Sequence, residues 1–474
     1  MNFDQFQSYY LVGVKGVAMT SIAQVLLDAG KSVRGSDTAE DFVTAEVLKK
    51  LNITIDSGFT ASIPDDCQCV IYTAAHKGAY NPQVIAAKDR GLPVFSQAEA
   101  LSSFFNAKKG IAVCGVGGKS TTSAMITWIL EKTGRNPSFS VGVGKIVGME
   151  KTGAWRSDSE YFVAEADEYV TDPSAPSRGE AITPRFSYLH PFVTICTNYR
   201  YDHPDVYATP ADTFAAFQAF FNQINPQGTL IINQHDLSTI PTQTTAHQTI
   251  TFGELGKADF SIMTEKTELS EGITKSVFYD AQDHQEYAIT LTLPGTYNLE
   301  NAAYAVLACK IIGVPVAESC AALASFSSTL RRFEKIGEKQ GVLYYDDYAH
   351  HPNEVRSVIE ALRGWYPHRR IVIAFQSHTY SRTKQLFSEF VTAFAAAQEV
   401  VMIDIFASAR EQFDPSISTD MLVAAIKEQY PEIQIENVKT IPALANYLRS
   451  HLQPGDICIT IGAGDIYTVH KLLE

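Results

Sequence analysis

The sequence predicts an α/β protein of three domains, each organised around a mostly parallel sheet. Three observations lead to this prediction. The chain has 474 residues, too many for one ordinary hydrophobic core and enough for about three domains. Short apolar runs alternate with helical patterns before residue 100 and again after Arg332, which is typical of parallel strands joined by right-handed crossovers. Between about 228 and 293 the pattern changes to alternating β-branched residues, which predicts added antiparallel strands.

Composition and charge exclude several classes of protein. Hydrophobic residues make up 45% of the chain and charged residues 19%, which is a globular composition. The net charge of −14 disfavours a general nucleic-acid binder, although a local basic pocket for a phosphorylated ligand is allowed. No apolar run approaches the ~20 residues that span a bilayer, and no secretory signal is visible. The seven cysteines lie mostly in apolar runs, which indicates a reducing compartment, so we expect a cytoplasmic protein.

We place the domain boundaries at 1–106, 107–326 and 327–474. The first domain has an amphipathic helix at 19–27, and the polar stretch 106–110 is expected to link it to the second. In the second domain a long helix begins at Lys119, residues 170–187 form a long loop, and another helix covers 299–312. The expected strands are 9–13, 32–35, 70–73, 93–95, 111–115, 162–164, 193–196, 342–345, 371–375, 400–403 and 457–461.

The most specific motif is Gly115-Val-Gly-Gly-Lys-Ser-Thr121, between an apolar strand and a helix. Glycines let the backbone wrap closely around a phosphate, and the helix N-terminus adds oriented N–H groups and a positive dipole end. Lys119 would contact the β- and γ-phosphates and Ser120 would bind Mg²⁺, although the loop is one residue shorter than the usual phosphate-loop spacing. The residues expected to bind ATP here are Gly115, Gly117, Gly118, Lys119, Ser120 and Thr121.

Acidic residues follow two other strands of the second domain. Glu165, Asp167 and Glu168 stand at the end of one strand, and Asp202-His-Pro-Asp205 follows another. Acids at a strand end can reach a metal held at a neighbouring phosphate loop. We therefore expect Glu165 to be a magnesium ligand and His203 to serve a metal as well.

A weaker glycine loop, Gly13-Val-Lys-Gly16, follows the first strand, with Asp37 further along. The spacing is similar to a dinucleotide fingerprint, but Lys15 and Ala18 replace two of its glycines. A nicotinamide cofactor is therefore disfavoured. Another nucleotide or diphosphate fits equally well, with Lys15 serving the phosphates.

Four further motifs complete the set, in this order: Leu293-Pro-Gly-Thr-Tyr-Asn-Leu-Glu-Asn301, Arg331-Arg-Phe333, Asp346-Asp-Tyr-Ala-His-His-Pro-Asn-Glu354 and Phe375-Gln-Ser-His-Thr-Tyr-Ser-Arg-Thr383. Together with the phosphate loop and a final Gly462-Ala-Gly-Asp465, they resemble the motifs of the Mur ligases, the ATP-dependent ligases that build the peptidoglycan stem peptide. The resemblance covers essentially the whole chain and is strongest to the branch that joins L-alanine to UDP-N-acetylmuramate. It implies a Rossmann-like UDP-sugar-binding domain, a central phosphate-loop ATPase domain with added strands, and a Rossmann-like amino-acid-binding domain.

The resemblance also implies roles for individual residues. Ser120 and Glu165 would hold the first Mg²⁺, and His203 would serve a second metal. Lys119, His203, Arg332 and His350 would be the catalytic residues. Asn298 and Asn301 would bind adenine, Arg332 a phosphate and Asp347 the ribose. The amino acid would lie among Tyr348, His350, His378 and Arg382, and the uridine diphosphate among Gly13, Lys15, Gly16, Ser36, Asp37 and Thr73.

The sequence departs from the family pattern at several positions. Val116 and Gly117 replace Thr and His of the family loop, and Ser120 replaces its second Thr. Tyr297 replaces a His before the adenine asparagine, Ser377 a Pro and Thr379 an Arg. The departure at Thr379 and the 170–187 loop leave the amino-acid preference open.

The implied reaction passes through an acyl phosphate. The substrate carboxylate attacks the γ-phosphate of ATP, and the amine of L-alanine then displaces phosphate, with His203 or His350 as the proton acceptor. Two alternatives within this resemblance are a ligase that attaches a preformed peptide to the same sugar nucleotide in cell-wall recycling, and a nucleotide-binding regulator with an eroded site. A third alternative, outside this resemblance, is a nicotinamide oxidoreductase. We expect a monomer or homodimer that binds no nucleic acid and inserts in no membrane.

Overall fold

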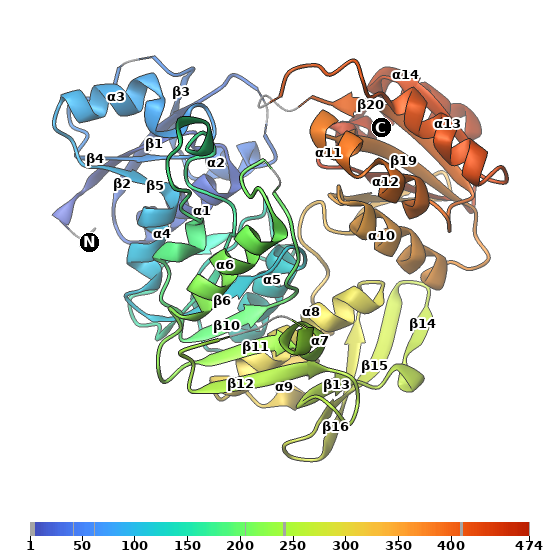
Figure 1. Cartoon of the computed structure of the whole chain (residues 1–474), viewed down its shortest axis with the longest axis horizontal. Helices are drawn as coiled ribbons and strands as arrows, with labels where there is room; N and C mark the ends of the chain where they lie inside the picture. Colours follow the sequence, from blue (N-terminus) through green and yellow to red (C-terminus); the bar gives the residue numbers. More distant parts are fainter. Residues whose placement is uncertain are drawn as a thin grey trace. The chain divides into compact units, whose positions relative to one another are not determined.

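The computed structural model describes residues 5–40, 42–60, 62–203, 205–239, 243–407 and 411–473. These residues form three sheets flanked by helices (Figure 1), which confirms the predicted three-domain α/β fold. The chain divides into two compact units, one made of Met1–Thr267, Ser276–Thr290 and Leu299–Phe326 and the other of Glu268–Lys275, Leu291–Asn298 and Ser327–Glu474. Among the described residues, no helix is long and apolar enough to cross a membrane.

The N-terminal sheet has five parallel strands in the order β3-β2-β1-β4-β5. Its central strand β1 alternates between two cores, because Tyr9 and Leu11 pack on one face while Tyr10 and Val12 pack on the other. Helices on both faces account for this double burial. The strands are β1 (Ser8–Val12), β2 (Ser32–Asp37), β3 (Thr54–Ser57), β4 (Cys69–Tyr72) and β5 (Val94–Ser96), and the helices are α1 (Val17–Asp28), α2 (Ala45–Lys50), α3 (Pro82–Asp89) and α4 (Gln97–Phe105).

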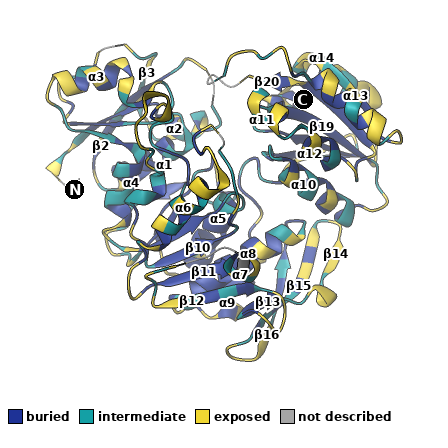
Figure 2. Cartoon of the chain, viewed as in Figure 1, coloured by how far each residue is buried: buried dark blue, intermediate teal, exposed yellow. Residues whose placement is uncertain are grey.

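The central sheet has eleven strands, in the order β14-β15-β13-β12-β11-β10-β6-β9-β7-β8, with β16 paired to β15. Its buried middle strands are dark in Figure 2. The strands are β6 (Lys109–Cys114), β7 (Ser138–Ser140), β8 (Gly153–Ala154), β9 (Tyr161–Glu165), β10 (Val193–Cys196), β11 (Thr229–Asn233), β12 (Gln248–Gly253), β13 (Phe260–Ile262), β14 (Glu268–Ser270), β15 (Ile273–Asp280) and β16 (Gln285–Leu291). The helices are α5 (Lys119–Lys132), α6 (Pro210–Phe221), α7 (Gln234–Thr239), α8 (Thr296–Ile311) and α9 (Val316–Leu323).

The prediction of added antiparallel strands after residue 228 is wrong for the first two of them. Strands β11 and β12 pair parallel with both of their neighbours, whereas β13 pairs parallel with β12 but antiparallel with β15, and β14 also pairs antiparallel with β15. Alternating β-branched residues show that one face of a strand is buried, but they carry no information about its direction.

The N-terminal sheet and most of the central sheet belong to the same compact unit and share a polar seam. The Ser21 and Ser140 hydroxyls lie 2.8 Å apart, and the Gln24 amide donates to the Thr152 hydroxyl at 3.1 Å. A Cβ on Gly153 would lie 2.2 Å from the Ser21 carbonyl oxygen, so a side chain here would push helix α1 away. The first two domains are thus held together by direct contacts as well as by the chain between them.

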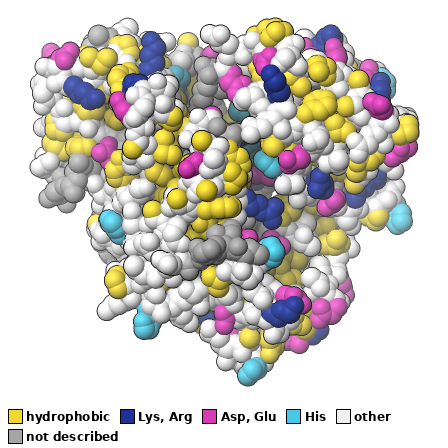
Figure 3. All heavy atoms as spheres, viewed as in Figure 1, with side chains coloured by type: hydrophobic (Ala, Val, Ile, Leu, Met, Phe, Trp, Pro, Cys, Tyr) yellow, Lys and Arg dark blue, Asp and Glu magenta, His cyan; other side chains and the backbone are white. Residues whose placement is uncertain are grey.

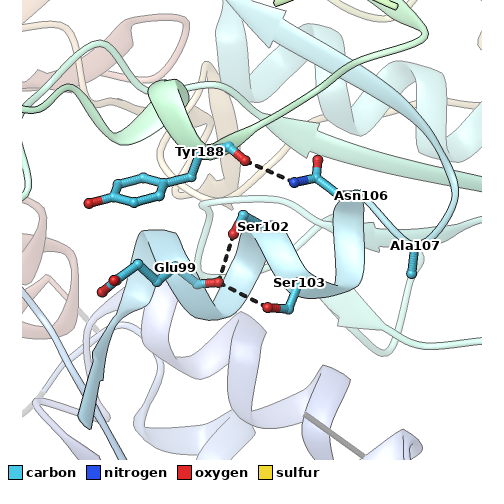
Figure 4. Close-up of a pocket in the computed structure, with 6 residues that line it drawn as sticks. All are labelled: Glu99, Ser102, Ser103, Asn106, Ala107 and Tyr188. Atoms are coloured by element: carbon cyan, nitrogen blue, oxygen red, sulfur yellow. Dashed lines mark hydrogen bonds between the residues drawn. The ribbon is translucent and has the colours of Figure 1, made fainter. Parts of the chain in front are cut away.

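The predicted linker 106–110 is shorter than expected, because β6 already begins at Lys109. The Asn106 amide donates to the Tyr188 carbonyl oxygen at 2.9 Å and accepts from the His190 N–H at 2.8 Å. Beside it lies a cavity of about 450 Å³ (Figure 4), lined by Glu99, Ser102, Ser103, Asn106, Ala107 and Tyr188. Both serine hydroxyls donate to the Glu99 carbonyl oxygen within α4, so these polar groups of the cavity have partners in their own helix.

The C-terminal sheet has six strands in the order β17-β18-β22-β19-β20-β21, parallel except for the edge strand β17. The strands are β17 (Glu334–Lys339), β18 (Val342–Asp347), β19 (Ile371–His378), β20 (Glu399–Phe406), β21 (Gln434–Lys439) and β22 (Ile457–Ile461). The helices are α10 (Pro352–Trp365), α11 (Tyr380–Gln385), α12 (Phe387–Ala393), α13 (Thr419–Gln429), α14 (Ile441–His451) and α15 (Val469–Leu472). On the face shown in Figure 3, basic and acidic side chains are interspersed.

Candidate active site

The glycine-rich loop joins β6 to α5 and is shaped by the residues that follow β10. Gly115 and Gly118 have positive φ angles of 119° and 82°. A Cβ on Gly115 would lie 2.3 Å from the Thr197 hydroxyl oxygen, and one on Gly118 would lie 2.4 Å from the Asn301 amide oxygen. Glycine is therefore required at both positions for conformation and for space.

Asn198 organises the same loop, and sequence reasoning did not place it in the site. Its amide oxygen accepts from the N–H groups of Val116 at 2.8 Å and Gly117 at 3.3 Å. Its amide nitrogen donates to the Gly117 carbonyl oxygen at 3.0 Å. Its position, two residues after a buried strand and at the edge of the sheet where ligands bind, could have indicated this role.

Lys119 forms a buried ion pair with Glu168. Its Nζ donates to both carboxylate oxygens of Glu168 at 2.8 Å and to the Gly115 carbonyl oxygen at 2.8 Å. Burial alone would lower the pKa of Lys119, but Glu168 and Asp167 outweigh it and raise that pKa, so the amine is charged at neutral pH. Sequence reasoning singled out Glu165 among the three acids and did not assign a role to Glu168.

The predicted pair of Ser120 and Glu165 is brought together. The Ser120 hydroxyl donates to one Glu165 carboxylate oxygen at 3.0 Å, and the Gly142 N–H donates to the other at 2.6 Å. Burial raises the pKa of Glu165, with Lys119 and these hydrogen bonds opposing. A hydroxyl and a carboxylate are oxygen ligands of the kind that Mg²⁺ prefers, so the two residues fit the predicted metal role.

A second set of possible metal ligands includes Glu168, the partner of Lys119. Ligand atoms of Glu168, Asp202 and His203 all lie within 4.8 Å of one another. The His203 Nε2 is 3.4 Å from a Glu168 carboxylate oxygen and 3.7 Å from one of Asp202. Burial lowers the pKa of His203, but its bond to Glu168 and the charge of Asp202 outweigh burial and raise it. Pro204, within the same sequence motif, lies outside the described residues.

The two predicted adenine residues both lie on α8. Asn301 lies beside the phosphate loop, where its amide oxygen accepts from the Thr122 hydroxyl at 3.2 Å. The Asn298 side chain is buried and donates to the Pro294 carbonyl oxygen at 2.7 Å. The predicted ATP residue Thr121 lies in the first turn of α5 and is also buried.

A third cluster forms at the carboxyl ends of the C-terminal strands. The Arg332 guanidinium lies over the Tyr348 ring at 5.1 Å. The Asp347 carboxylate accepts from the N–H groups of Phe333 and Ala349, both at 2.7 Å. Burial raises the pKa of Asp347 to about 6, although Arg332 and these two bonds oppose it.

His350, His378 and Arg382 lie in the same cluster. The two histidine rings are 6.2 Å apart, and an Arg382 Nη donates to the His378 carbonyl oxygen at 3.2 Å. Burial lowers the pKa of His350 to about 4, assisted by the charges of Arg382 and Arg332 and opposed by Glu354. His350 is therefore neutral at pH 7. The four residues predicted for amino-acid binding thus come together in one cluster with Arg332.

The N-terminal residues meet at the carboxyl ends of β1, β2 and β4. The Gly13 N–H donates to the Ser36 carbonyl oxygen at 2.9 Å, and a Cβ on Gly13 would lie 2.4 Å from the Thr73 methyl carbon. Gly16 is the N-cap residue of α1. The Asp37 carboxylate accepts from the Lys15 N–H at 2.7 Å.

Two predicted side chains of this region are turned toward the protein. The Lys15 Nζ donates to the carbonyl oxygens of Thr38 and Glu40, both at 2.7 Å. The buried Ser36 hydroxyl donates to the Gln83 amide at 2.5 Å. His76, which sequence reasoning missed, lies 3.7 Å from Asp37 and against the Phe59 ring.

Comparison with known proteins agrees with this architecture. Three family models match in chain order: "Mur ligase family, catalytic domain" over residues 8–109, "Mur ligase middle domain" over 113–309 and "Mur ligase, glutamate ligase domain" over 331–464. The chain is 35% identical to the UDP-N-acetylmuramate–L-alanine ligase of Desulfitobacterium hafniense, covering 98% of each chain. It is 34% identical to that of Desulforamulus reducens, over 98% of this chain and 96% of the relative. The chain belongs to the Mur ligase family.

Solved structures support the same fold for this Mur ligase. The UDP-N-acetylmuramate–alanine ligase of Thermotoga maritima matches with a TM-score of 0.79, 23% identity and 98% coverage of both chains. A murein peptide ligase of Psychrobacter arcticus matches with a TM-score of 0.69, 20% identity and 98% coverage of both. The middle-domain model covers the phosphate loop and the Glu165, Glu168 and His203 group of this Mur ligase.

Proposed function

We propose that this Mur ligase joins L-alanine to UDP-N-acetylmuramate, with conversion of ATP to ADP and phosphate. The observation that carries the proposal is the similarity to L-alanine ligases along 98% of the chain. The site agrees with it, because a phosphate loop with a buried lysine and a cluster of arginine and histidine supply what acyl phosphorylation and amide formation need. The proposed division of labour is UDP-sugar binding by 1–106, ATP binding by 107–326 and amino-acid binding by 327–474.

In the first step the substrate carboxylate attacks the γ-phosphate. Both groups are negatively charged, so the site must offset their repulsion. Lys119 and Arg332 supply positive charge to the phosphoryl group as negative charge moves onto the leaving ADP. The Glu168 carboxylate fixes the position of the Lys119 Nζ, 2.8 Å away, and the raised pKa of Lys119 keeps the amine charged. Mg²⁺, when bound, would neutralise phosphate charge: Ser120 and Glu165 would hold one ion, and Glu168, Asp202 and His203 are the residues that would hold a second metal.

In the second step the amine attacks the acyl carbon and phosphate leaves. The guanidinium fork of Arg382 is suited to bind the carboxylate of the amino acid through two hydrogen bonds. His350 is neutral at pH 7, because its pKa is lowered to about 4, so it can accept a hydrogen bond from the incoming amine. We therefore favour His350 over His203 as the group that faces the amine, since His203 lies among the possible metal ligands.

The decisive experiment measures phosphate release from ATP and Mg²⁺ with UDP-N-acetylmuramate, offering L-alanine, L-serine, glycine and the tripeptide that begins L-Ala-γ-D-Glu. We expect release only when both the sugar nucleotide and L-alanine are present, with the amide product confirmed by mass. Release only with the tripeptide would identify the recycling ligase instead. If no acceptor leads to phosphate release although ATP still binds, the protein is a nucleotide-binding regulator.

A further inference from the structure

Helix α11 carries Arg382 and is only six residues long, Tyr380–Gln385. A helix of this length does not hold its shape alone, because its few internal hydrogen bonds do not offset the conformational entropy lost in forming the first turn. Its orientation therefore depends on contacts from outside. The guanidinium of Arg382 lies at the end of a long side chain. A small tilt of the helix would therefore move the guanidinium further than it moves the helix backbone.

Glu411, from the segment after β20, supplies those contacts at the N-terminus of α11. One carboxylate oxygen accepts from the Thr379 hydroxyl at 2.8 Å and from the Ser381 hydroxyl. The other accepts from the Ser381 N–H at 3.3 Å. A carboxylate at this end also has a favourable interaction with the helix dipole. Glu411 thus fills the role of an N-cap, although it lies 32 residues from the N-cap residue Thr379.

The charge of Glu411 fits this role. Partial burial raises the pKa of Glu411, but the hydrogen bonds from Ser381 and Thr379 outweigh burial and lower it. The carboxyl group is therefore ionised at neutral pH. Hydrogen bonds to an ionised acceptor are stronger than those between neutral groups.

Thr383 attaches the next turn of α11 to β19. Its hydroxyl lies 2.6 Å from the Ser377 hydroxyl and donates to the Thr379 carbonyl oxygen at 2.6 Å. Ser377 and Thr379 are two of the positions at which this chain departs from the family pattern. Both departures supply hydroxyls to the contacts that hold α11.

Arg382 connects this helix to the proposed amino-acid site. One of its Nη atoms donates to the His378 carbonyl oxygen at 3.2 Å, and its charge contributes to the lowered pKa of His350. The orientation of α11 therefore determines the position of the Arg382 guanidinium relative to His350 and His378.

We propose that Glu411 is a positioning residue that holds α11, and through it Arg382, in the orientation that binds the carboxylate of the amino-acid substrate. This inference rests on the proposed function. Loss of the carboxylate leaves the Ser381 N–H and two hydroxyls to water and loosens the helix. From the usual effect of losing an N-cap, the KM for L-alanine should rise about 5- to 30-fold.

The test compares Glu411→Ala, Glu411→Gln and, as a matched control, Gln412→Ala, an exposed neighbour on the same segment. Glu411→Ala should raise the KM for L-alanine while leaving the KM values for ATP and UDP-N-acetylmuramate unchanged. Glu411→Gln keeps an acceptor oxygen and should restore part of the affinity. In an Arg382→Ala background, Glu411→Ala should have little further effect, because Glu411 acts through Arg382. Full additivity of the two substitutions, or an equal rise in all three KM values, would overturn the inference.

Hydrogen exchange separates this inference from the proposed function. In Glu411→Ala the amides of residues 381–385 should exchange faster than in the wild-type protein, while Gln412→Ala should leave them unchanged. Unchanged exchange in Glu411→Ala overturns the positioning role whatever the activity. Absence of L-alanine-dependent turnover in the wild-type protein would instead overturn the proposed function, and the exchange result would still decide whether Glu411 holds α11.

Discussion

Lys119 and Glu168 form an ion pair beneath the phosphate loop, with the Lys119 Nζ 2.8 Å from both carboxylate oxygens. Glu168 is 1% exposed, so neither charge is well solvated. Glu168 also lies within reach of His203 and Asp202. One carboxylate therefore holds the proposed catalytic lysine and belongs to a possible metal site, which links phosphate binding to metal binding.

Replacing Lys119 with methionine should leave the Glu168 carboxylate buried without its main partner. We expect the free energy of unfolding to fall by roughly 3–5 kcal/mol at neutral pH. Turnover should fall by about 10²- to 10³-fold, as for loss of one preorganised donor. Urea unfolding and phosphate release measure the two effects separately.

The matched control is the double variant Lys119→Met with Glu168→Gln, which removes both charges. Stability should largely return while turnover stays low, because the lysine charge is still missing. Wild-type turnover in Lys119→Met would contradict its catalytic role.

Gly118→Ala should abolish tight nucleotide binding. The new Cβ would lie 2.4 Å from the Asn301 amide oxygen, at a φ of 82°. Gly134→Ala is the matched control, since it has a φ of 72° and nothing within 4 Å of the added Cβ. Both variants bear the left-handed strain of roughly 1–2 kcal/mol, but only Gly118→Ala should lose ATP affinity in calorimetry. Equal ATP affinity in the two variants would show that the contact with Asn301 is unimportant.

Glu165→Ala should raise the Mg²⁺ concentration needed for half-maximal turnover by at least about tenfold, since Glu165 is the carboxylate paired with Ser120. The comparison is Glu160→Ala, an exposed carboxylate that pairs with Lys109 close to the start of β9. A magnesium titration of turnover distinguishes them. If both variants require the same Mg²⁺ concentration as the wild-type protein, Glu165 is not a metal ligand.

Asp347 should make the stability of the protein depend on pH in a specific window. Burial raises its pKa from 3.8 to about 6 in the folded chain, so the folded state retains the proton to higher pH than the unfolded state. The stability from this group is complete below the unfolded pKa and is lost as the pH rises through the folded pKa, by roughly 3 kcal/mol.

Asp347→Asn removes this titration; its single amide oxygen can accept from only one of the Phe333 and Ala349 N–H groups, and loss of the other bond lowers stability equally at every pH. Urea unfolding at several pH values from 3.5 to about 6.5 should show the wild-type protein losing stability relative to Asp347→Asn as the pH rises. A constant difference across this window would mean that Asp347 is ionised as readily in the folded chain as in the unfolded one.

Several features of this protein could be predicted from the sequence because they depend on local patterns. The motif Gly115–Thr121 predicts a phosphate loop between a strand and a helix; the loop joins β6 to α5, and the last three residues of the motif form the first turn of α5. The regular alternation of apolar runs and helical patterns predicts parallel sheets in the first and last domains, which the structure confirms except for the antiparallel edge strand β17. The motif that contains His378 and Arg382 could be singled out because it lies at the carboxyl end of a strand, where ligands bind in open α/β sheets, and the family resemblance then implies the roles of the two residues.

Other features were decided only by the tertiary structure, because they depend on residues far apart in the chain. The partner of Lys119 is 49 residues away, and the Glu411 bond to Thr379 spans 32 residues. The Lys15 amine, predicted to serve phosphates, donates to the carbonyl oxygens of Thr38 and Glu40, which follow β2. Strand direction in β12 and β13 likewise depends on which neighbour each strand meets. Local periodicity determines which segments are strands and helices, whereas burial and long-range pairing determine which charges meet and which protons they hold.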